Sequence, residues 1–223
     1  DLESRDFTIN SIGFHLHKKK IIDPQRGLID LVRYKLNCPN KKNLINDPLR
    51  ILRFFRFYSE YNLKFEPSLI IFISEHKKLL SEVATERIIY ELRKIFKSQG
   101  SLKALLLINE IKLFDWLQKY EDFSSESMKN LNFHFFKSEE LEIFLPLYYL
   151  TEILEEDAIK KLKFSRYESS SCKSINKWKR KLTFKSITKF TELERFELHS
   201  EMENILPAFI FYLPFEFRNH WLT

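Results

Sequence analysis

Apolar and polar residues alternate along the first part of the chain and then recur with a helical period over the rest. Residues 7–16 alternate in this way, with a shift near Ser11, and predict a strand. Residues 21–24 predict a short returning strand that ends at Pro24, and the polar residues 17–20 predict the turn between them. A β-hairpin is the simplest assembly of these two strands.

Two short segments and a loop connect this hairpin to the helical part of the chain. After a turn at Gly27, Leu28–Leu31 is expected to be a short helical or turn segment, and Val32–Leu36 a further short strand. The polar residues 40–43 are expected to form a loop. So few strands do not form an independent sheet, and we expect their partners to lie upstream in the sequence.

Apolar residues recur at helical spacing over the remainder of the chain. The first predicted helix spans residues 47–61, with Asp47 as its N-cap and Pro48 at its first position. Gly100 is expected to end the third helix, because glycine is common just past helix C-termini. The other expected helices are 67–80, 86–97, 101–109 with a short follower at 111–119, 139–154, 155–162, 166–182, 187–199 and 203–213, with Pro146 and Pro207 bending or dividing theirs.

The composition agrees with a mostly helical protein. The chain has 223 residues, 44% of them hydrophobic, with only 3 glycines and 22 phenylalanines, so a sizeable core and many helices are expected. Its formal net charge of +6 permits an anionic partner such as RNA, or a solvated lysine-rich surface. Cys38 and Cys172 have no C-x-x-C partner, which argues against a disulfide framework or a cysteine zinc site. This use of cysteine fits a location in the reducing cytoplasm.

The sequence carries no sign of membrane insertion or export. No apolar run approaches 18 residues, so we expect no transmembrane helix and no membrane partner. No signal peptide is seen. The chain begins at Asp1, directly in front of patterned sequence, which suggests a cut inside a domain or a gene fragment.

Three arginines gather at the start of the first predicted helix. Arg50, Arg53 and Arg56 follow at steps of three, and each step turns back about 60° around a helix, so one wide face should carry all three. With Asp47, they offer forked donors and a carboxylate acceptor to the edge of a planar ring, or donors to phosphates. An amphipathic helix with three solvated arginines is the alternative interpretation.

Three other clusters have both a functional and a structural interpretation. His15 and His17 share one strand face at a spacing found in metal sites, but no third ligand accompanies them, so surface histidines are favoured. The acidic run 155–157 is favoured as a complement to a helix dipole over a carboxylate site. The basic residues 173–185, with Trp178, suit either contact with RNA or a solvated helix whose tryptophan is in the core.

Four short motifs follow one another over the first hundred residues. They are Ser-Arg-Asp-Phe-Thr-Ile-Asn-Ser at 4–11, Asp-Pro-Gln-Arg-Gly-Leu-Ile-Asp-Leu at 23–31, Asn-Asp-Pro-Leu-Arg at 46–50, and Thr-Glu-Arg-Ile at 85–88 with Glu91 and Leu92 after it. In this order and spacing they resemble motifs of the tRNA nucleotidyltransferase/poly(A) polymerase family, the class II CCA-adding enzymes. That family has Arg-Arg-Asp-Phe-Thr-x-Asn-Ala, Asp-Pro-x-x-Gly-x-x-Asp-Leu, Glu-Asp-x-x-Arg and a Glu-Arg motif.

The resemblance implies a mostly α fold, with a short β-hairpin remnant of a nucleotidyltransferase head sheet followed by an all-helical neck, body and tail. Residues 1–45 would be the C-terminal part of the head domain. Residues 46–120 would be the neck, an RNA-binding and nucleotide-selecting helical domain, and residues 121–223 the helical body and tail. A complete enzyme of this family adds C and A to tRNA 3′ ends with Mg²⁺, so the tRNA 3′ end, CTP and ATP are the expected partners.

The resemblance also implies roles for individual residues. Asp47 and Arg50 would contact the Watson–Crick edge of CTP or ATP. Arg53 and Arg56 would lie along the same face towards the nucleotide, and Arg5 would contact it from the head. Supporting roles would fall to Asp6, Asn10, Asn46, Glu86 and Arg87.

Several positions depart from the family pattern. Ser4 stands where the first arginine is usual, Asn46 replaces the glutamate, and Gln25-Arg26 replaces an aromatic-glycine pair. The family's Gly-Gly-x-x-Arg-Asp and Asp-x-Asp segments, which hold Mg²⁺, occur nowhere in this sequence, so we assign no catalytic residue and no metal ligand. The alternatives are a poly(A) polymerase, an enzyme that adds only CC or only A, a non-catalytic RNA-binding remnant, and a split enzyme completed by an upstream chain.

Overall fold

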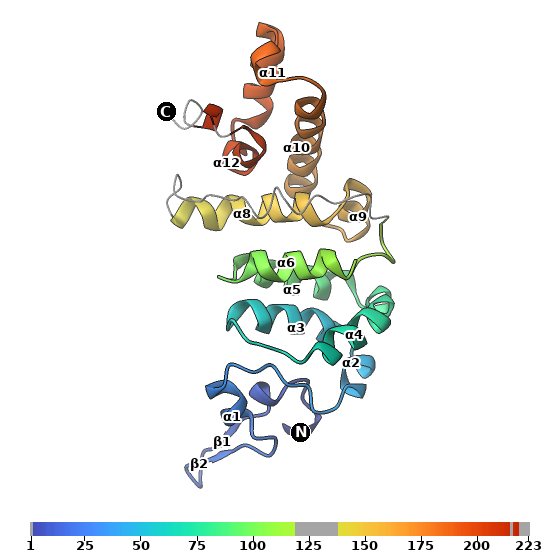
Figure 1. Ribbon diagram of the computed structural model, residues 1–223, viewed down its shortest axis with the longest axis vertical. Coiled ribbons are helices and arrows are strands. Elements are labelled where there is room, and N and C mark those ends of the chain that lie inside the picture. The colour runs from blue at the N-terminus through green and yellow to red at the C-terminus, as the bar shows by residue number, and fades with distance from the viewer. Residues whose placement is uncertain (1, 119–137, 215, 219–223) are drawn as a thin grey trace. The chain divides into compact units, whose positions relative to one another are not determined.

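The computed structural model describes residues 2–118, 138–214 and 216–218, most of them in helices (Figure 1). The chain divides into two compact units, Asp1–Tyr120 and Glu121–Thr223, and each is described by itself. The sheet in the described part has two strands, so the predicted mostly α fold is confirmed. The first unit includes both residues 1–45 and residues 46–120, and a domain boundary between them stays a prediction.

A short hairpin and one helix follow the N-terminal segment of the first unit. β1 (Gly13–His15) pairs antiparallel with β2 (Lys20–Ile22), and Phe14 lies opposite Ile21. This confirms the predicted hairpin in a shorter form. α1 (Gly27–Val32) follows at the segment predicted to be helix or turn. Two 3-10 helices precede the hairpin, η1 (Leu2–Ser4) and η2 (Thr8–Asn10).

The strand predicted over residues 7–16 is wrong in its first half. Phe7 is fully buried, with its ring edge-on to Phe57 at 5.6 Å between centroids and tilted against Phe54 at 6.4 Å. These two rings belong to a helix, so the side chain is drawn away from the hairpin and the backbone at residues 8–10 turns instead of extending.

The segment between α1 and the first long helix also departs from its local pattern. Val32 ends α1, and Tyr34 has a left-handed φ of 52° that turns the chain, so the strand predicted at residues 32–36 is wrong. A short helix, α2 (Lys42–Asn46), takes up part of the predicted polar loop, because Leu44 is fully buried in the core.

The core of the first unit is built from four helices close to the predicted positions, α3 (Leu49–Glu60), α4 (Pro67–His76), α5 (Thr85–Lys97) and α6 (Ser101–Glu110). A 3-10 helix, η3 (Lys77–Glu82), follows α4. α3 packs against α5 and α6, and fully buried side chains such as Leu52, Ile88 and Leu105 fill the space between them. Burying each such side chain stabilises the fold by roughly 1.5–3 kcal/mol.

Predictions about helix ends are less accurate. Asp47 does not cap α3, because Pro48 takes the N-cap position and no side chain caps the helix. Gly100 does not end α5 in a left-handed conformation. A β-carbon there would lie 2.5 Å from the Ser59 carbonyl oxygen, so glycine is required for the close approach of α3 and the start of α6. Residues 111–117 form turns at the predicted short follower.

The described residues of the second unit form α8 (Ser138–Ile153), α9 (Glu156–Lys161), α10 (Arg166–Phe184), α11 (Glu192–Met202) and α12 (Leu206–Phe209), with 3-10 helices η4 (Ile187–Lys189) and η5 (Ile210–Tyr212). Thr191 forms a capping box with Glu194, so the helix predicted from residue 187 is divided. Pro146 lies inside α8, and Pro207 opens α12 instead of dividing a helix. Within the described ranges, no helix combines the length and apolar character of a membrane span.

Candidate nucleotide-binding site

Buried polar contacts hold the segment 4–11 between α1 and α3. Thr8 Oγ1 donates a hydrogen bond of 2.7 Å to Asp30 Oδ2. Gly27 lies so close that a β-carbon would stand 2.0 Å from the Thr8 carbonyl oxygen. Asp23 accepts a hydrogen bond from the Gly27 N–H at 2.6 Å and so satisfies the start of α1. The first two sequence motifs therefore pack against each other and fix this segment.

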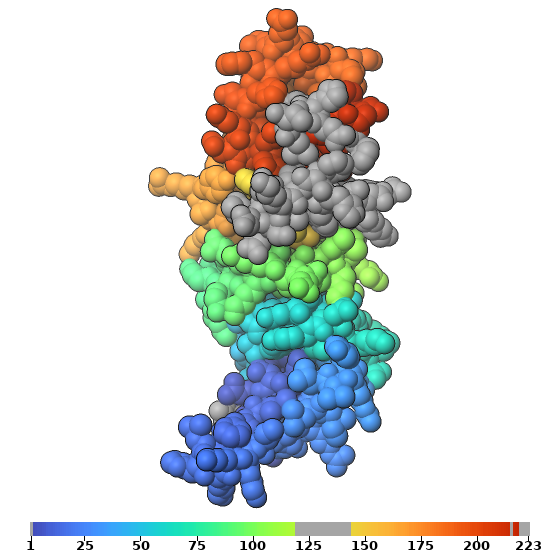
Figure 2. Space-filling model, turned by 90° about the vertical axis from the view of Figure 1, so that its left-hand side faces the viewer, coloured from blue at the N-terminus to red at the C-terminus, as the bar shows by residue number. Residues whose placement is uncertain are grey.

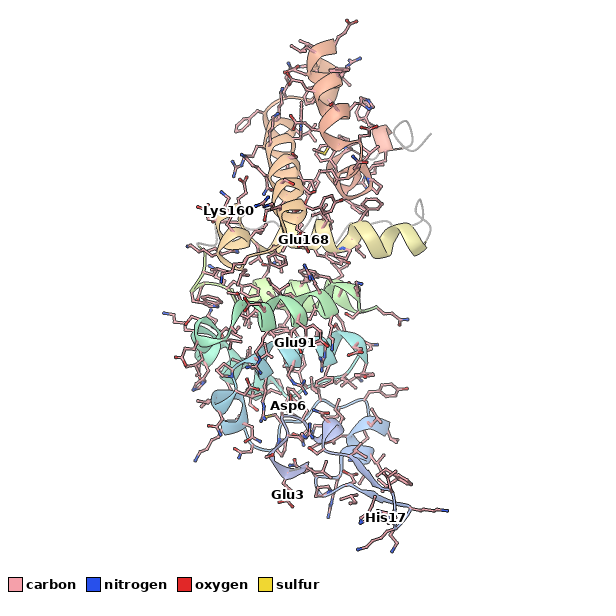
Figure 3. All side chains as sticks on the ribbon, turned by 180° about the vertical axis from the view of Figure 1, so that it is seen from behind. Glu3, Asp6, His17, Glu91, Lys160 and Glu168 are labelled. Atoms are coloured by element: carbon pink, nitrogen blue, oxygen red, sulfur yellow. The ribbon has the colours of Figure 1, made fainter. Side chains whose placement is uncertain are left out.

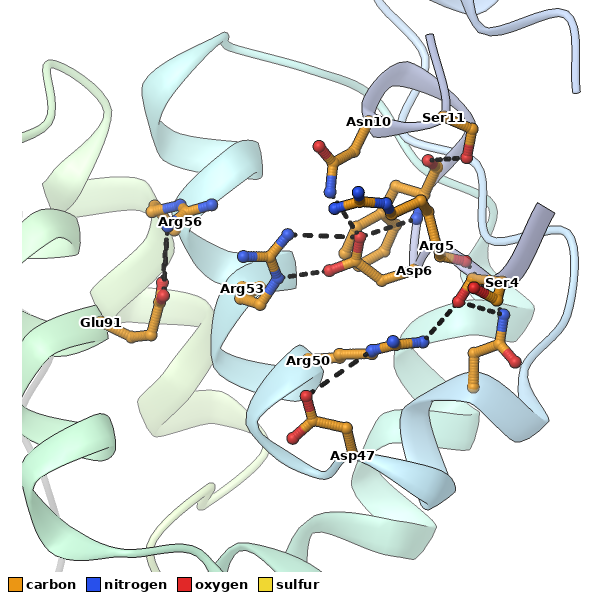
Figure 4. Close-up of polar contacts among 12 residues, drawn as sticks. Ser4, Arg5, Asp6, Asn10, Ser11, Asp47, Arg50, Arg53, Arg56 and Glu91 are labelled. Atoms are coloured by element: carbon orange, nitrogen blue, oxygen red, sulfur yellow. Dashed lines mark hydrogen bonds and ion pairs between the residues drawn. The ribbon is translucent and has the colours of Figure 1, made fainter. Parts of the chain in front are cut away.

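Asp6 is the buried centre of the contacts between this segment and α3 (Figure 4). Its carboxylate accepts hydrogen bonds from Arg53 Nε and Nη2, from Asn10 Nδ2 at 2.9 Å and from the Phe7 N–H at 3.2 Å. Burial acts to raise the pKa of Asp6, but the hydrogen bonds from Arg53 and Asn10 and the Arg53 charge outweigh it and lower that pKa. Burial acts to lower the pKa of Arg53, and the contact with Asp6 raises it overall.

Asp47 and Arg50 lie beside this cluster at the start of α3 (Figure 4). Arg50 Nη1 donates to the Ser4 carbonyl oxygen at 3.0 Å, and its Nε lies 3.8 Å from Asp47 Oδ2. Arg87, in the first turn of α5, donates to the two Asp47 carboxylate oxygens at 3.2 and 3.3 Å. The Asp47 and Arg50 side chains remain 33% and 23% exposed. The protein thus orients an acceptor beside a donor, and both can still contact a ligand.

Arg56 does not share an open face with Arg50 and Arg53. Two steps of three residues turn it about 120° from Arg50 around α3, into the contact with α5. There it is 8% exposed, its Nη1 donates to Glu91 Oε1 at 3.1 Å, and its Nε lies 3.8 Å from Glu60 Oε2. Figure 3 shows Asp6 and Glu91 apart from each other along the unit. A contact of Arg56 with a nucleotide stays a prediction.

The other predicted residues lie at the surface of the first unit. Arg5, Asn46 and Glu86 are exposed, and the Glu86 charge in the first turn of α5 complements the helix dipole. A further contact with the segment 4–11 comes from Asn43, which was not predicted: its Nδ2 donates to the Arg5 carbonyl oxygen at 2.9 Å. Asn43 lies in an ordinary polar run, so no local signal distinguishes it.

In the described part of the chain, no group of three or more His, Cys, Asp or Glu side chains could hold a metal ion. The rings of His15 and His17 lie 6.2 Å apart at the hairpin, where Figure 3 labels His17. The acidic run 155–157 falls at the start of α9, where Glu156 and Asp157 occupy the first turn. These described residues therefore supply no ligand cluster for the expected Mg²⁺.

The basic stretch 173–185 lies on α10, and several of its lysines are paired. Trp178 is fully buried, and its Nε1 donates to Glu201 at 2.9 Å, so its core interpretation is confirmed. Lys177 also contacts Glu201, and Lys179 contacts Glu152. Hydrogen bonds from Lys185, the Thr191 N–H and Lys181 lower the pKa of Glu194 to about 2. These pairs partly neutralise the charge on which contact with RNA would depend.

Comparison with known proteins extends this picture. The family described as "Probable RNA and SrmB-binding site of polymerase A" matches residues 62–122. A CC-adding tRNA nucleotidyltransferase of Synechocystis sp. is 32% identical over 133 residues, which are 59% of this chain and 30% of that protein. The Thermotoga maritima CCA-adding enzyme complexed with tRNA matches with a TM-score of 0.73 at 21% identity, over 99% of this chain and 58% of that one. The Bacillus stearothermophilus CCA-adding enzyme in complex with CTP matches with a TM-score of 0.69 at 21% identity, over 100% and 56%.

The fold, the interlocked motifs and these similarities place the chain beside proteins of the nucleotidyltransferase class. Over part of its length the chain is similar to proteins named as CC-adding and CCA-adding tRNA nucleotidyltransferases, and it shares its fold with solved CCA-adding enzymes. It spans about a third of the length of the curated relatives it matches.

Proposed function

We propose that this chain is the part of a cytoplasmic tRNA nucleotidyltransferase of the CCA-adding type that selects CTP and ATP and holds the tRNA 3′ end. The observation that carries the proposal is the Asp47–Arg50 pair, a carboxylate and a guanidinium that are partly exposed and held by Arg87 and Ser4. The CTP and tRNA complexes of the structural neighbours support this choice of ligands.

Cytosine and adenine share an edge that fits this pair. Each base presents an exocyclic amino donor next to a ring-nitrogen acceptor. Asp47 would accept from the amino group, and Arg50 would donate to the ring nitrogen. Uracil and guanine present a carbonyl oxygen and a ring N–H at these places, so both protein groups would be left unpaired. An unpaired polar group at a binding site is a strong basis for rejecting a ligand.

The contacts within the protein leave this capacity intact. A guanidinium has five N–H donors, and Arg50 uses one of them on the Ser4 carbonyl oxygen. Each Asp47 oxygen can accept more than the one hydrogen bond that it receives from Arg87. Because the pair is already oriented, less side-chain entropy is lost when a base binds.

The hairpin and α1 carry an exposed apolar surface. This surface supports the proposal that a further polypeptide packs there and completes the head. This end of the first unit is blue in Figure 2. Large apolar residues with at least 39% exposure are Phe14, Leu16, Ile21, Ile22, Leu28, Ile29, Leu31, Val32 and Tyr34. Such a patch marks an interface, and two strands alone are marginally stable. An upstream polypeptide seated here would bring the carboxylates for Mg²⁺.

Nucleotide binding to the purified chain tests the proposed selection. The wild type should prefer CTP and ATP over UTP and GTP. Arg50→Ala should lose roughly tenfold or more of that preference, because a charge-assisted hydrogen bond contributes about 1.5–3 kcal/mol. Arg33→Ala removes an exposed arginine on α1's C-cap and serves as the charge-matched control. If Arg50→Ala lowers the stability of the protein but its folded form keeps the preference for CTP and ATP, Arg50 is structural and the proposal fails.

Extension of a tRNA that lacks its 3′ CCA distinguishes the enzymes of this family. The assay uses the chain co-expressed with its upstream polypeptide. Products that stop after CCA support the proposal, whereas long A tails indicate a poly(A) polymerase, and products that stop at CC or gain only A indicate the specialised enzymes. Absence of any incorporation favours a non-catalytic RNA-binding remnant, the alternative that Ser4 and Asn46 suggest.

A further inference from the structure

A cavity of about 600 Å³ opens between the C-terminal ends of α3 and α5. Its volume is within the range of small-ligand sites. Three cations and one carboxylate among its lining residues make it positively charged. The lining includes Arg56, Phe57, Glu60, Tyr61, Lys94 and Lys97.

The cavity lies on the same side of α3 as the Asp47–Arg50 pair. At 3.6 residues per turn, Phe57 and Tyr61 lie within about 20° of Arg50 around the helix axis, and Tyr61 lies about 16 Å further along it. Arg53 and Arg56 place their Cζ atoms 5.3 and 4.5 Å from the centroid of the Phe57 ring. The two guanidinium groups therefore flank the Phe57 ring between the pair and the cavity, while Asp6 and Glu91 hold them in place.

The lining combines an available aromatic face with cations. Tyr61 is 47% exposed and stacks on Phe57, with 6.1 Å between centroids. Lys94 and Lys97 are exposed. Arg56 is more than nine-tenths buried, and its Nε has no hydrogen-bond partner among the described residues. Aromatic rings that stack on bases, beside cations that follow the backbone, are how proteins bind single-stranded nucleic acid.

We infer that this α3–α5 cavity binds one nucleotide unit of the RNA strand behind its 3′ end, with the base against Tyr61 and the phosphates on Lys94 and Lys97. The strand would then run along α3 from the cavity towards the Asp47–Arg50 pair, which lies at the other end of this helix. The inference rests on the proposed function, because it takes the RNA to be the strand whose 3′ end is presented to that pair.

Binding of a tRNA transcript truncated before its CCA end, measured by fluorescence anisotropy over a series of salt concentrations, tests the inference. Lys94→Gln/Lys97→Gln should weaken binding roughly tenfold at 0.1 M salt. It should also reduce the slope of log K against log salt by about 1.4, since each phosphate contact on a single strand contributes about 0.7. Lys78→Gln/Lys112→Gln removes two other exposed lysines of the same unit and should weaken binding by less than about threefold.

Tyrosine variants test the aromatic face separately. Tyr61→Ala should weaken tRNA binding roughly tenfold because it removes the stacking surface. Tyr61→Phe keeps the ring and should bind as the wild type does. Thermal melting of each variant shows whether it is folded.

The outcomes distinguish this inference from the proposed function. An unchanged tRNA affinity and salt slope in Lys94→Gln/Lys97→Gln and in Tyr61→Ala would overturn the inference and leave the selection of CTP and ATP standing. An equal loss of CTP binding in the lysine variant would also overturn it, by assigning the cavity to the free triphosphate. Lysine-dependent tRNA binding by a wild type without preference among nucleotides supports the cavity and refutes the proposed selection.

Discussion

Substitution of Asp6 tests whether its ion pair with Arg53 holds the N-terminal segment on α3. Asp6→Asn keeps the shape of the side chain but removes its charge, so Arg53 then faces a neutral amide. Removing one partner of a fully buried pair costs about 3–5 kcal/mol. The Asp6 side chain is 2% exposed and that of Arg53 is 24% exposed. Water therefore compensates part of the loss, and we expect a destabilisation of about 2–4 kcal/mol.

Urea denaturation measures this cost. With an m value of about 2 kcal/mol per molar, the unfolding midpoint should fall by roughly 1–2 M. Hydrogen–deuterium exchange should locate the loss in residues 4–11 and α3. Because the pKa of Asp6 is lowered in the folded state, its stabilisation is present above the unfolded value of about 4 and is lost as pH falls through the folded one. The stability of Asp6→Asn should therefore depend less on pH below about 5.

A double-mutant cycle with Arg53→Met isolates the pair. We expect a coupling energy of about 1–3 kcal/mol between the two positions. Asn10→Ala is the control, because it removes one neutral donor to the same carboxylate and should cost only about 1 kcal/mol. Single costs that add within about 0.5 kcal/mol would refute the argument, as would wild-type stability in Asp6→Asn.

Three further predictions concern other buried or paired groups. Glu91→Gln should destabilise the first unit by about 2–4 kcal/mol, because buried Arg56 keeps only the half-exposed Glu60, 3.8 Å away, as a countercharge. Arg56→Met/Glu91→Leu should recover much of that loss in urea denaturation, and a double variant no more stable than Glu91→Gln would contradict this. Burial raises the pKa of Cys38 to about 11 and that of Cys172 to about 12, so both thiols should resist iodoacetamide at pH 8 until the protein unfolds, as mass spectrometry would show; prompt labelling of the folded protein would be the opposite result. The pKa of Glu194 is lowered to about 2. The ionised carboxylate therefore stabilises the folded protein above its ordinary pKa of about 4.3, and this stabilisation is lost as pH falls towards 2. NMR titration of Lys185→Gln should show a higher pKa for Glu194, whereas an unchanged pKa would refute the pairing.

The main helices of the first unit could be predicted because amphipathic spacing is a local property. The predicted helix 47–61 corresponds to α3, and Pro67 marks the start of α4 as expected. The hairpin was predictable for the same reason, since β1 and β2 are joined by a short polar turn. Each of these elements depends on contacts between residues that are close in the sequence.

The predictions that failed depend on partners far away in the sequence. Local sequence rules predict Asp47 to be an N-cap. In the structure Asp47 lies at the end of α2, and Arg87, 40 residues later, orients the Asp47 carboxylate. Residues 7–11 alternate like a strand, but burial of Phe7 against α3 turns the backbone. In both places a long-range contact outweighs a weak local preference.

The candidate site also combines features set by neighbouring residues with contacts between residues far apart in the sequence. Local patterns and motifs suffice to predict a hairpin followed by helices, an arginine-rich α3 and its family resemblance, because all of these depend on neighbouring residues. Packing of the chain on itself decides which charges remain available. Arg53 pairs with Asp6 and Arg56 with Glu91, whereas Asp47 and Arg50 stay partly exposed. The residues of the first two pairs are 47 and 35 positions apart. The path of the backbone brings them together, and no local pattern specifies that path.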